Sequence, residues 1–136
     1  MGLILGAFIL LTPGCAGDPQ SLLMDHLWTF EDFTTDSEDE NVQSLVAFAK
    51  AFLTDATLEF QDGGVYILAS PLSETPSTGT WELIGEDQLI MDPDGEDTAS
   101  TGNIEVLTKN QLSYIETFTD EDSNTYTTTT TWVKAD

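Results

Sequence analysis

Basic residues are almost absent from this sequence. Its 136 residues include three lysines and no arginine against 25 acidic residues, so the formal net charge is −22. Nucleic acids are bound through clustered Lys and Arg, and basic patches also hold proteins on anionic membranes. The composition therefore argues against nucleic acid as a partner and against an electrostatic attachment to a membrane. A content of 40% hydrophobic residues is nevertheless enough for a folded core.

Histidine and cysteine are equally scarce, with one residue of each, His26 and Cys15. A Ser-His-Asp triad or a histidine-containing zinc site would depend on His26, at the start of a predicted strand, where an imidazole more often packs or lies at a rim. Among 25 acids, some pair will stand at a glycosidase-like separation by chance, so such pairs indicate nothing. We therefore predict no enzyme activity, no catalytic residue and no cofactor.

Long hydrophobic runs are also missing. The apolar stretch at residues 3–11 has nine residues, whereas a membrane-spanning helix needs about 20. A short apolar run that ends in small residues is typical of a secretory signal. The segment Leu11–Cys15 (LTPGC) resembles a bacterial lipoprotein signal, with Gly14 before the cysteine but Thr12 and Pro13 at atypical positions.

This resemblance implies that residues 1–14 are a lipoprotein signal peptide and that Cys15 is the site of lipid attachment. The membrane would then be a partner through an N-terminal lipid anchor. Ala16 after the cysteine carries no acidic retention signal, which by resemblance to enterobacterial sorting favours the outer membrane. The alternative is an ordinary signal peptide that leaves Cys15 as a free thiol, since a lone cysteine forms no intramolecular disulfide.

A helix is predicted over residues 41–53, where apolar residues follow helical spacing. Ser37–Glu40 (SEDE) matches a capping box before it. We expect the helix to lie across one end of the domain with its apolar stripe on the core. The stripe consists of Val42, Leu45, Val46, Ala49, Phe52 and Leu53.

Short alternating segments separated by turn residues fill the rest of the chain and predict eight strands. Hairpin connections between them are typical of an all-β fold, an eight-stranded antiparallel up-and-down β-barrel. Residues 27–136 would form this domain, and residues 15–26 would be the lipidated N-terminus and tether. The predicted strands are 27–33, 57–61, 65–70, 79–84, 88–91, 103–108, 111–119 and 125–133.

Four of these segments resemble the lipocalin-like domain of small Bacteroidetes-type lipoproteins. The resemblance covers about residues 27–133, and His26 stands where a glycine is usual two residues before the first tryptophan. It implies a lipocalin-like barrel that can enclose an apolar cavity, and it implies no defined reaction. The segments are Leu27-Trp28, Leu58–Tyr66 (LEFQDGGVY), Gly79–Leu83 (GTWEL) and Ile104–Leu112 (IEVLTKNQL).

Aromatic residues on the predicted strands are the candidate ligand-binding residues. Inward residues of an eight-stranded barrel either fill the interior or leave room for one small ligand. The sequence thus favours a non-enzymatic, lipid-anchored protein of the cell envelope that binds a small hydrophobic ligand. The alternative is a structural or protein-interaction module with a filled core, its partner unknown. The candidates are Trp28, Phe60, Tyr66, Trp81, Tyr114 and Trp132.

The acidic loop at residues 92–97 contains Asp92, Asp94, Gly95 and Asp97. Several carboxylates on a tight loop suit calcium, but the EF-hand pattern has glycine at the sixth position and this loop has it at the fourth. Asp-Pro-Asp-Gly is also an ordinary turn sequence. We predict a turn here and no metal site.

Replacing the cysteine tests the predicted anchor. The substitution Cys15→Ser removes the acceptor thiol, and we expect it to move the protein from the membrane fraction to the soluble fraction, because stable anchoring requires more than one acyl chain. Fractionation of cells that express each form measures this. An unchanged membrane fraction for the serine variant would contradict lipidation at Cys15.

Overall fold

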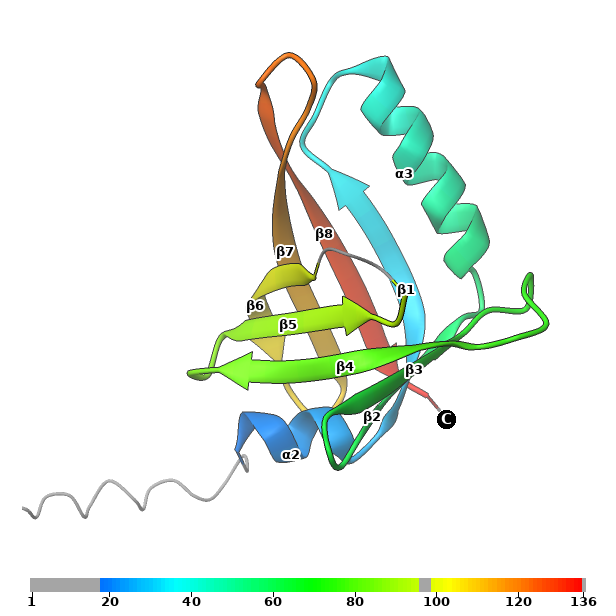
Figure 1. Cartoon of the computed structure of the whole chain (residues 1–136), viewed down its shortest axis with the longest axis vertical. Coiled ribbons are helices and arrows are strands. Elements are labelled where there is room, and N and C mark those ends of the chain that lie inside the picture. Colours follow the sequence, from blue (N-terminus) through cyan, green and yellow to red (C-terminus); the bar gives the residue numbers. More distant parts are fainter. Residues whose placement is uncertain (1–17, 96–98, 136) are drawn as a thin grey trace, which may run out of the picture.

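The chain folds into one closed β-barrel (Figure 1). The computed structural model describes residues 18–95 and 99–135. Each strand pairs antiparallel with the next along the chain, and the last pairs with the first, which confirms the predicted eight-stranded up-and-down barrel. The strands are β1 (Leu27–Thr35), β2 (Thr57–Gln61), β3 (Val65–Ala69), β4 (Ser77–Ile84), β5 (Gln88–Pro93), β6 (Ser100–Leu107), β7 (Gln111–Thr119) and β8 (Thr125–Lys134).

Local sequence explains most of the strand boundaries. The turn between β2 and β3 places Gly63 and Gly64 at φ of 92° and 81°, where a side chain would be strained. β4 and β6 begin two and three residues earlier than predicted, and β5 ends two residues later. The added residues pair with residues of the neighbouring strand, as Pro93 does with Gly79. Backbone pairing therefore continues past the segments in which apolar and polar residues alternate.

The pairing of β1 with β8 closes the barrel. It runs from Trp28 opposite Lys134 to Thr35 opposite Thr128, with a shift in register between Phe30 and Asp32. Such a bulge bends the strand and increases its twist. The threonine-rich β8 suits this position, because threonine favours strands and its alternate hydroxyls face opposite sides of the sheet.

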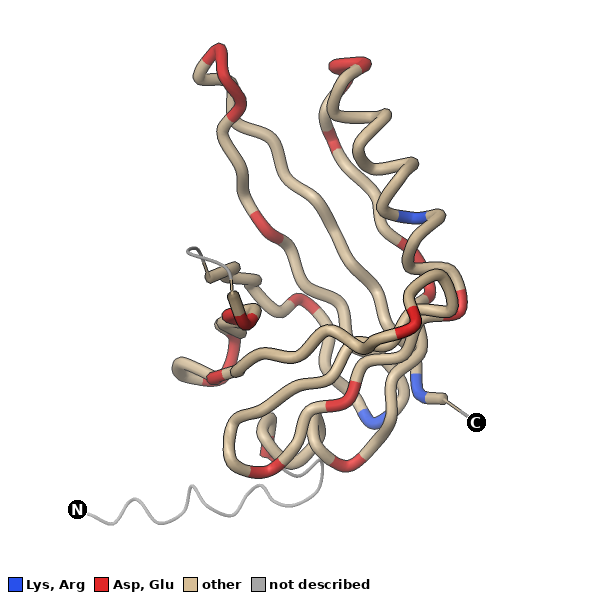
Figure 2. Tube along the Cα trace, turned by 45° about the vertical axis from the view of Figure 1, so that its right-hand side comes forward, with Lys and Arg blue, Asp and Glu red and all other residues tan. Residues whose placement is uncertain are grey.

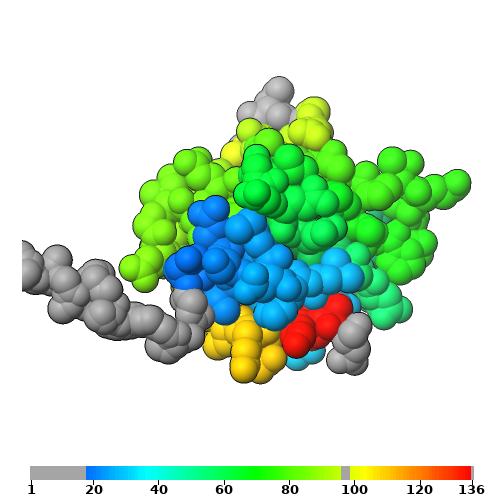
Figure 3. Space-filling view, turned by 90° about the horizontal axis from the view of Figure 1, so that it is seen from below, coloured from blue at the N-terminus to red at the C-terminus, as the bar shows by residue number. Residues whose placement is uncertain are grey.

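A short helix, α2 (Pro19–Met24), lies across one end of the barrel, as Figure 3 shows from below. The Asp18 carboxylate accepts a hydrogen bond of 2.8 Å from the Ser21 N–H and caps the helix. Leu23 of this helix and Trp28 at the start of β1 are fully buried, and the Trp28 Nε1 donates to the Leu23 carbonyl at 3.0 Å. The sequence predicts only a tether over residues 15–26, so this helix is an addition to the predicted fold.

The second helix, α3 (Glu40–Leu53), begins one residue before the predicted start. Its cap is Asp39, whose carboxylate accepts a hydrogen bond of 2.7 Å from the Asn41 N–H. The Ser37 hydroxyl instead accepts from the Asp39 N–H, outside the helix. The predicted capping box starting at Ser37 is therefore wrong, because a carboxylate two residues later occupies the cap position.

α3 runs beside β1 rather than across the end of the barrel (Figure 1). Val42 is buried, but Leu45 is 64% exposed and Phe48 74% exposed. An ion pair of 2.9 Å between Lys50 and Asp32 joins the helix to β1. The predicted packing of the whole apolar stripe is thus wrong at Leu45. A helix that lies along a single strand is buried on one side only, and its other side stays exposed to solvent. Neither helix that the structure describes has the length and apolar character needed to span a membrane.

The barrel is densely filled toward α2. Phe30 and Trp132 from the closing strands meet edge to face, with their ring centroids 5.6 Å apart. Phe60 and Trp81 meet in the same way at 5.3 Å. These arrangements are the ones that aromatic pairs prefer. The fully buried large side chains are Trp28, Phe60, Leu23, Leu58, Leu89 and Leu112.

Gly79 offers a test of how tightly the barrel wall is packed. A Cβ at this position would lie 2.5 Å from the Asp92 carbonyl oxygen and 2.6 Å from the Tyr66 ring. We expect Gly79→Ala to lower the free energy of unfolding by about 1–3 kcal/mol, as overpacking does. Urea unfolding measures this, with Thr80→Ala, on the exposed side of the same strand, as control. Equal stabilities of the two variants would contradict the close approach of Tyr66 and Asp92.

Candidate ligand-binding cavity

A partly enclosed cavity of about 150 Å³ lies inside the barrel. Leu68, Leu89 and Met91 form its apolar wall, together with Pro93. Tyr66, Tyr114, Ser100 and Glu116 supply its polar groups. The residues come from β3, β5, β6 and β7, so the cavity exists only once these four strands stand around a common interior.

Two glycines shape this cavity by making room for its tyrosines. A Cβ on Gly79 would lie 2.6 Å from the Tyr66 ring, and one on Gly102 would lie 2.7 Å from the Tyr114 ring. Each ring therefore lies against the bare backbone of a neighbouring strand. A tyrosine that packs over a glycine in this way also compensates for the missing side chain.

Tyr114 is held in place from β8. Its hydroxyl accepts a hydrogen bond of 3.3 Å from the Trp132 Nε1. Burial, with a smaller contribution from the charge of Glu116, raises the pKa of Tyr114 above its ordinary value of 10.0. Tyr114 therefore stays a neutral, fixed wall of the cavity over the physiological pH range.

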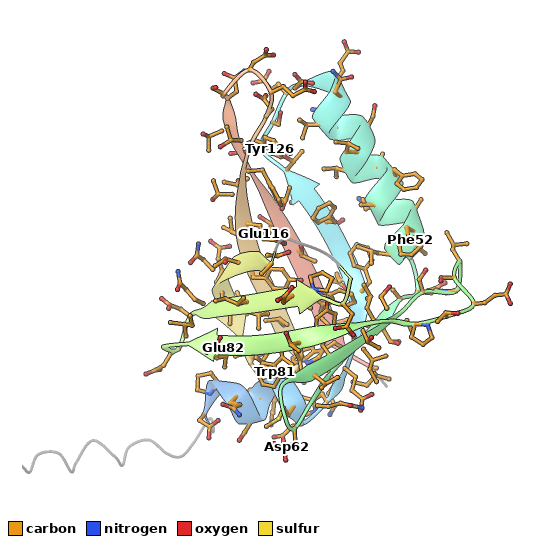
Figure 4. All side chains as sticks on the ribbon, viewed as in Figure 1. Phe52, Asp62, Trp81, Glu82, Glu116 and Tyr126 are labelled. Atoms are coloured by element: carbon orange, nitrogen blue, oxygen red, sulfur yellow. The ribbon has the colours of Figure 1, made fainter. Side chains whose placement is uncertain are left out.

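Glu116 is the acidic residue of the cavity (Figure 4). It lies on β7, two residues beyond Tyr114 and on the same face, and it is partly buried. Burial raises the pKa of its carboxyl group above the ordinary value of 4.5. Glu116 is not among the predicted ligand-binding residues, although the alternation Leu112, Tyr114, Glu116 indicates that it faces the interior.

The six predicted ligand-binding aromatics are all buried, but the structure separates them into two groups. Tyr66 and Tyr114 line the cavity. Trp28 packs into the core near α2, and Trp132 packs against Phe30. Trp81 contacts Phe60, and its Nε1 donates to the Gln61 carbonyl at 3.1 Å. The structure thus brings together two of the candidates with residues that were not predicted, Leu68, Leu89, Met91 and Glu116.

The structure describes His26 but not Cys15. His26 is partly buried before β1, with its ring edge-on to Trp28 at a centroid distance of 5.8 Å. Its Nε2 is buried and lacks a hydrogen-bond partner among the described residues. This is a packing position, in keeping with the sequence interpretation. Cys15 and the predicted signal peptide at residues 1–14 lie outside the described residues.

The acidic loop contains a turn in its described part. Gly95 has a φ of 84°, and the Asp94 carboxylate accepts a hydrogen bond of 2.7 Å from the Thr78 hydroxyl. Asp92 belongs to β5, and Asp97 lies outside the described residues. Across residues 18–95 and 99–135, no three His, Cys, Asp or Glu side chains gather closely enough to hold a metal ion.

Two larger hollows lie on the outer surface. One, of about 450 Å³, is lined by α2 residues such as Gln20 and by Gly85 in the turn after β4. The other, of about 380 Å³, is lined by Glu82 and Asp92 on the exposed side of β4 and β5. Both are wide open and border exposed polar side chains, so they would bury less of a ligand than the cavity inside the barrel.

No model of a known protein family matches the chain, and no curated protein matches it. What the site can do must therefore follow from its own geometry. An apolar wall with two fixed tyrosines and one carboxylate suits the binding of a small molecule.

The raised pKa of Glu116 predicts that the substitution Glu116→Gln changes the free energy of unfolding by an amount that depends on pH. Well below pH 4.5 the carboxyl is protonated in both the folded and the unfolded chain, so Glu116→Gln should change little. As the pH rises through the raised pKa, the folded wild-type protein must bear a desolvated charge. In urea unfolding, we expect the Gln variant to become increasingly more stable than wild type as the pH rises above 4.5, and the difference to level off above the raised pKa of the folded protein.

Glu82→Gln is the control for this experiment. Glu82 is exposed on the outside of β4, and its replacement also removes one charge from the acidic surface (Figure 4). It reports the general repulsion among the acidic residues without a change in the interior. The same pH dependence in both variants would contradict an interior position for the Glu116 carboxylate.

Proposed function

We propose that this protein is a lipid-anchored, lipocalin-like barrel of the cell envelope that binds a small hydrophobic ligand and catalyses no reaction. The observation that carries the proposal is the cavity of about 150 Å³ inside a closed barrel. Its wall combines Leu68, Leu89 and Met91 with a few polar groups. Ligand sites are usually of this kind, mostly apolar with a small number of convergent polar atoms.

The volume limits what the cavity can accept. Cavities of about 150 Å³ bind molecules the size of benzene, whereas sites for drug-sized ligands occupy about 300–1,000 Å³. The barrel therefore takes up one ring or one short aliphatic chain. A larger ligand would leave its remaining atoms outside, at the open part of the cavity.

The position of α2 supports a simple orientation at the membrane. Asp18 caps α2 and follows Cys15 by three residues, which span at most about 11 Å. A lipid on Cys15 would thus hold the end covered by α2 close to the bilayer, which we take to be the outer membrane. Glu116 and the β7–β8 hairpin would then face away from the bilayer (Figure 4).

A second candidate function is contact with another envelope protein through α3. Leu45 and Phe48 are large apolar side chains that lie mostly exposed on this helix. Exposed apolar residues that gather on one face are a feature of interaction surfaces. This function would not need the cavity.

Native mass spectrometry distinguishes the two candidates. We expect the full chain, incubated with a lipid extract of its source cells, to carry a discrete adduct that is lost on unfolding. Ser100→Leu would fill part of the cavity and should abolish the adduct. Thr101→Leu, an exposed position on the same strand, should retain it.

A bare mass for wild type, or an adduct that survives Ser100→Leu, would contradict binding in the cavity. In that case the barrel would act as a filled scaffold, and the exposed residues of α3 would be the remaining candidate site.

A further inference from the structure

A purely hydrophobic ligand would give no reason for the Glu116 carboxylate in the wall of the cavity. This carboxylate borders an apolar cavity, and burial alone accounts for its raised pKa. Within residues 18–95 and 99–135, neither a hydrogen bond nor an ion pair to this carboxylate is found. A partly buried charge without a partner costs free energy of folding, so a group that paired with it would bind favourably.

The lysines of the chain lie elsewhere (Figure 2). Lys50 pairs with Asp32 on the outer side of β1. Lys109 stands in the turn before β7, and Lys134 ends β8, opposite Trp28 near the end covered by α2. Among the described residues that line the cavity there is no lysine, arginine or histidine.

Thr128 provides a second, independent observation. It stands directly opposite Glu116 on β8, and residues opposite each other on antiparallel strands share a face of the sheet. Its side chain is 3% exposed, and its Oγ1 has no hydrogen-bond partner in the described part of the chain. The interior thus holds an unpaired hydroxyl opposite Glu116, but Glu116 alone of the two lines the cavity and can be reached by a ligand there.

We infer that the ligand of this cavity is a small organic cation, a protonated amine on an aromatic or short aliphatic body. The inference rests on the proposed function and specifies the chemistry of the ligand. The ammonium group donates to the Glu116 carboxylate, which lines the cavity. The apolar body lies against Leu68, Leu89 and Met91, which line the same cavity.

The remaining groups of the site favour the same charge. The faces of the Tyr66 and Tyr114 rings attract cations through their quadrupoles. An anion such as a fatty-acid carboxylate would meet the Glu116 charge at close range and the field of the whole acidic surface. A neutral apolar molecule would leave the Glu116 carboxylate without a partner.

Three probes of nearly equal size test the charge preference. Benzylamine, benzyl alcohol and benzoate share one ring and differ in charge. We expect the full chain to bind benzylamine at least about tenfold more tightly than benzyl alcohol, and benzoate not at all, by isothermal titration calorimetry at about pH 8 and 0.15 M NaCl. The salt screens attraction between the amine and the exposed acids.

Two variants locate the effect. Glu116→Gln should reduce the benzylamine affinity about tenfold or more and leave the affinity for benzyl alcohol unchanged. Glu82→Gln removes a charge from the exposed side of β4 and should leave both affinities unchanged.

The outcomes separate the two proposals. Benzyl alcohol binding as tightly as benzylamine, or an equal loss of amine affinity in the Glu116 and Glu82 variants, would overturn the cation inference and leave the cavity function standing. Failure of all three probes and of the lipid extract to bind would overturn the proposed function itself. Selective loss of benzylamine with Glu116→Gln supports both.

Discussion

The pairing of β1 with β8 is the constraint on which the rest of the structure depends. It joins the first and last strands of the barrel, from Trp28 opposite Lys134 to Thr35 opposite Thr128. Closure pairs both edges of the sheet, which would otherwise be open to other chains. It also creates the interior. Phe30 and Trp132 become neighbours at 5.6 Å, and the inward face of β7 becomes the wall of an enclosed space.

This interior is filled unevenly, and the uneven filling underlies the proposed function. Toward α2, Leu23 and Trp28 are fully buried, and a helix covers that end. Farther along, Gly79 and Gly102 contribute no side chains, and the rings of Tyr66 and Tyr114 occupy the space above them. The volume left over is the cavity of about 150 Å³. The dense packing and the proposed binding site thus lie in different parts of one barrel, and an eight-stranded barrel has room for one small ligand.

Acidic residues lie in different environments on the two sides of the barrel wall. On the outside, acidic residues gather in turns and at strand ends, where water solvates them (Figure 2). Such a surface keeps the protein soluble and raises the local concentration of cations. Inside, Glu116 is partly withdrawn from water, and burial raises its pKa. Acidic residues are therefore hydrated on the outside of the barrel, whereas inside it Glu116 is the candidate residue for selecting the ligand.

The sequence by itself determined the eight strands, the helix after the first strand and the all-β class, because alternation and turn residues are local properties. The predicted bounds of β2 and β7 are those observed. The sequence did not determine α2, the cap at Asp39, the exposure of Leu45, or which two of six aromatics line the cavity. Alternation predicts that Glu116 lies on the inward face of β7, but it does not predict that Tyr66 and Thr128 are its neighbours. Only the register of the strands and the closure of the barrel decide how deep each inward side chain lies and what stands opposite it, because these depend on pairings between residues far apart in the chain.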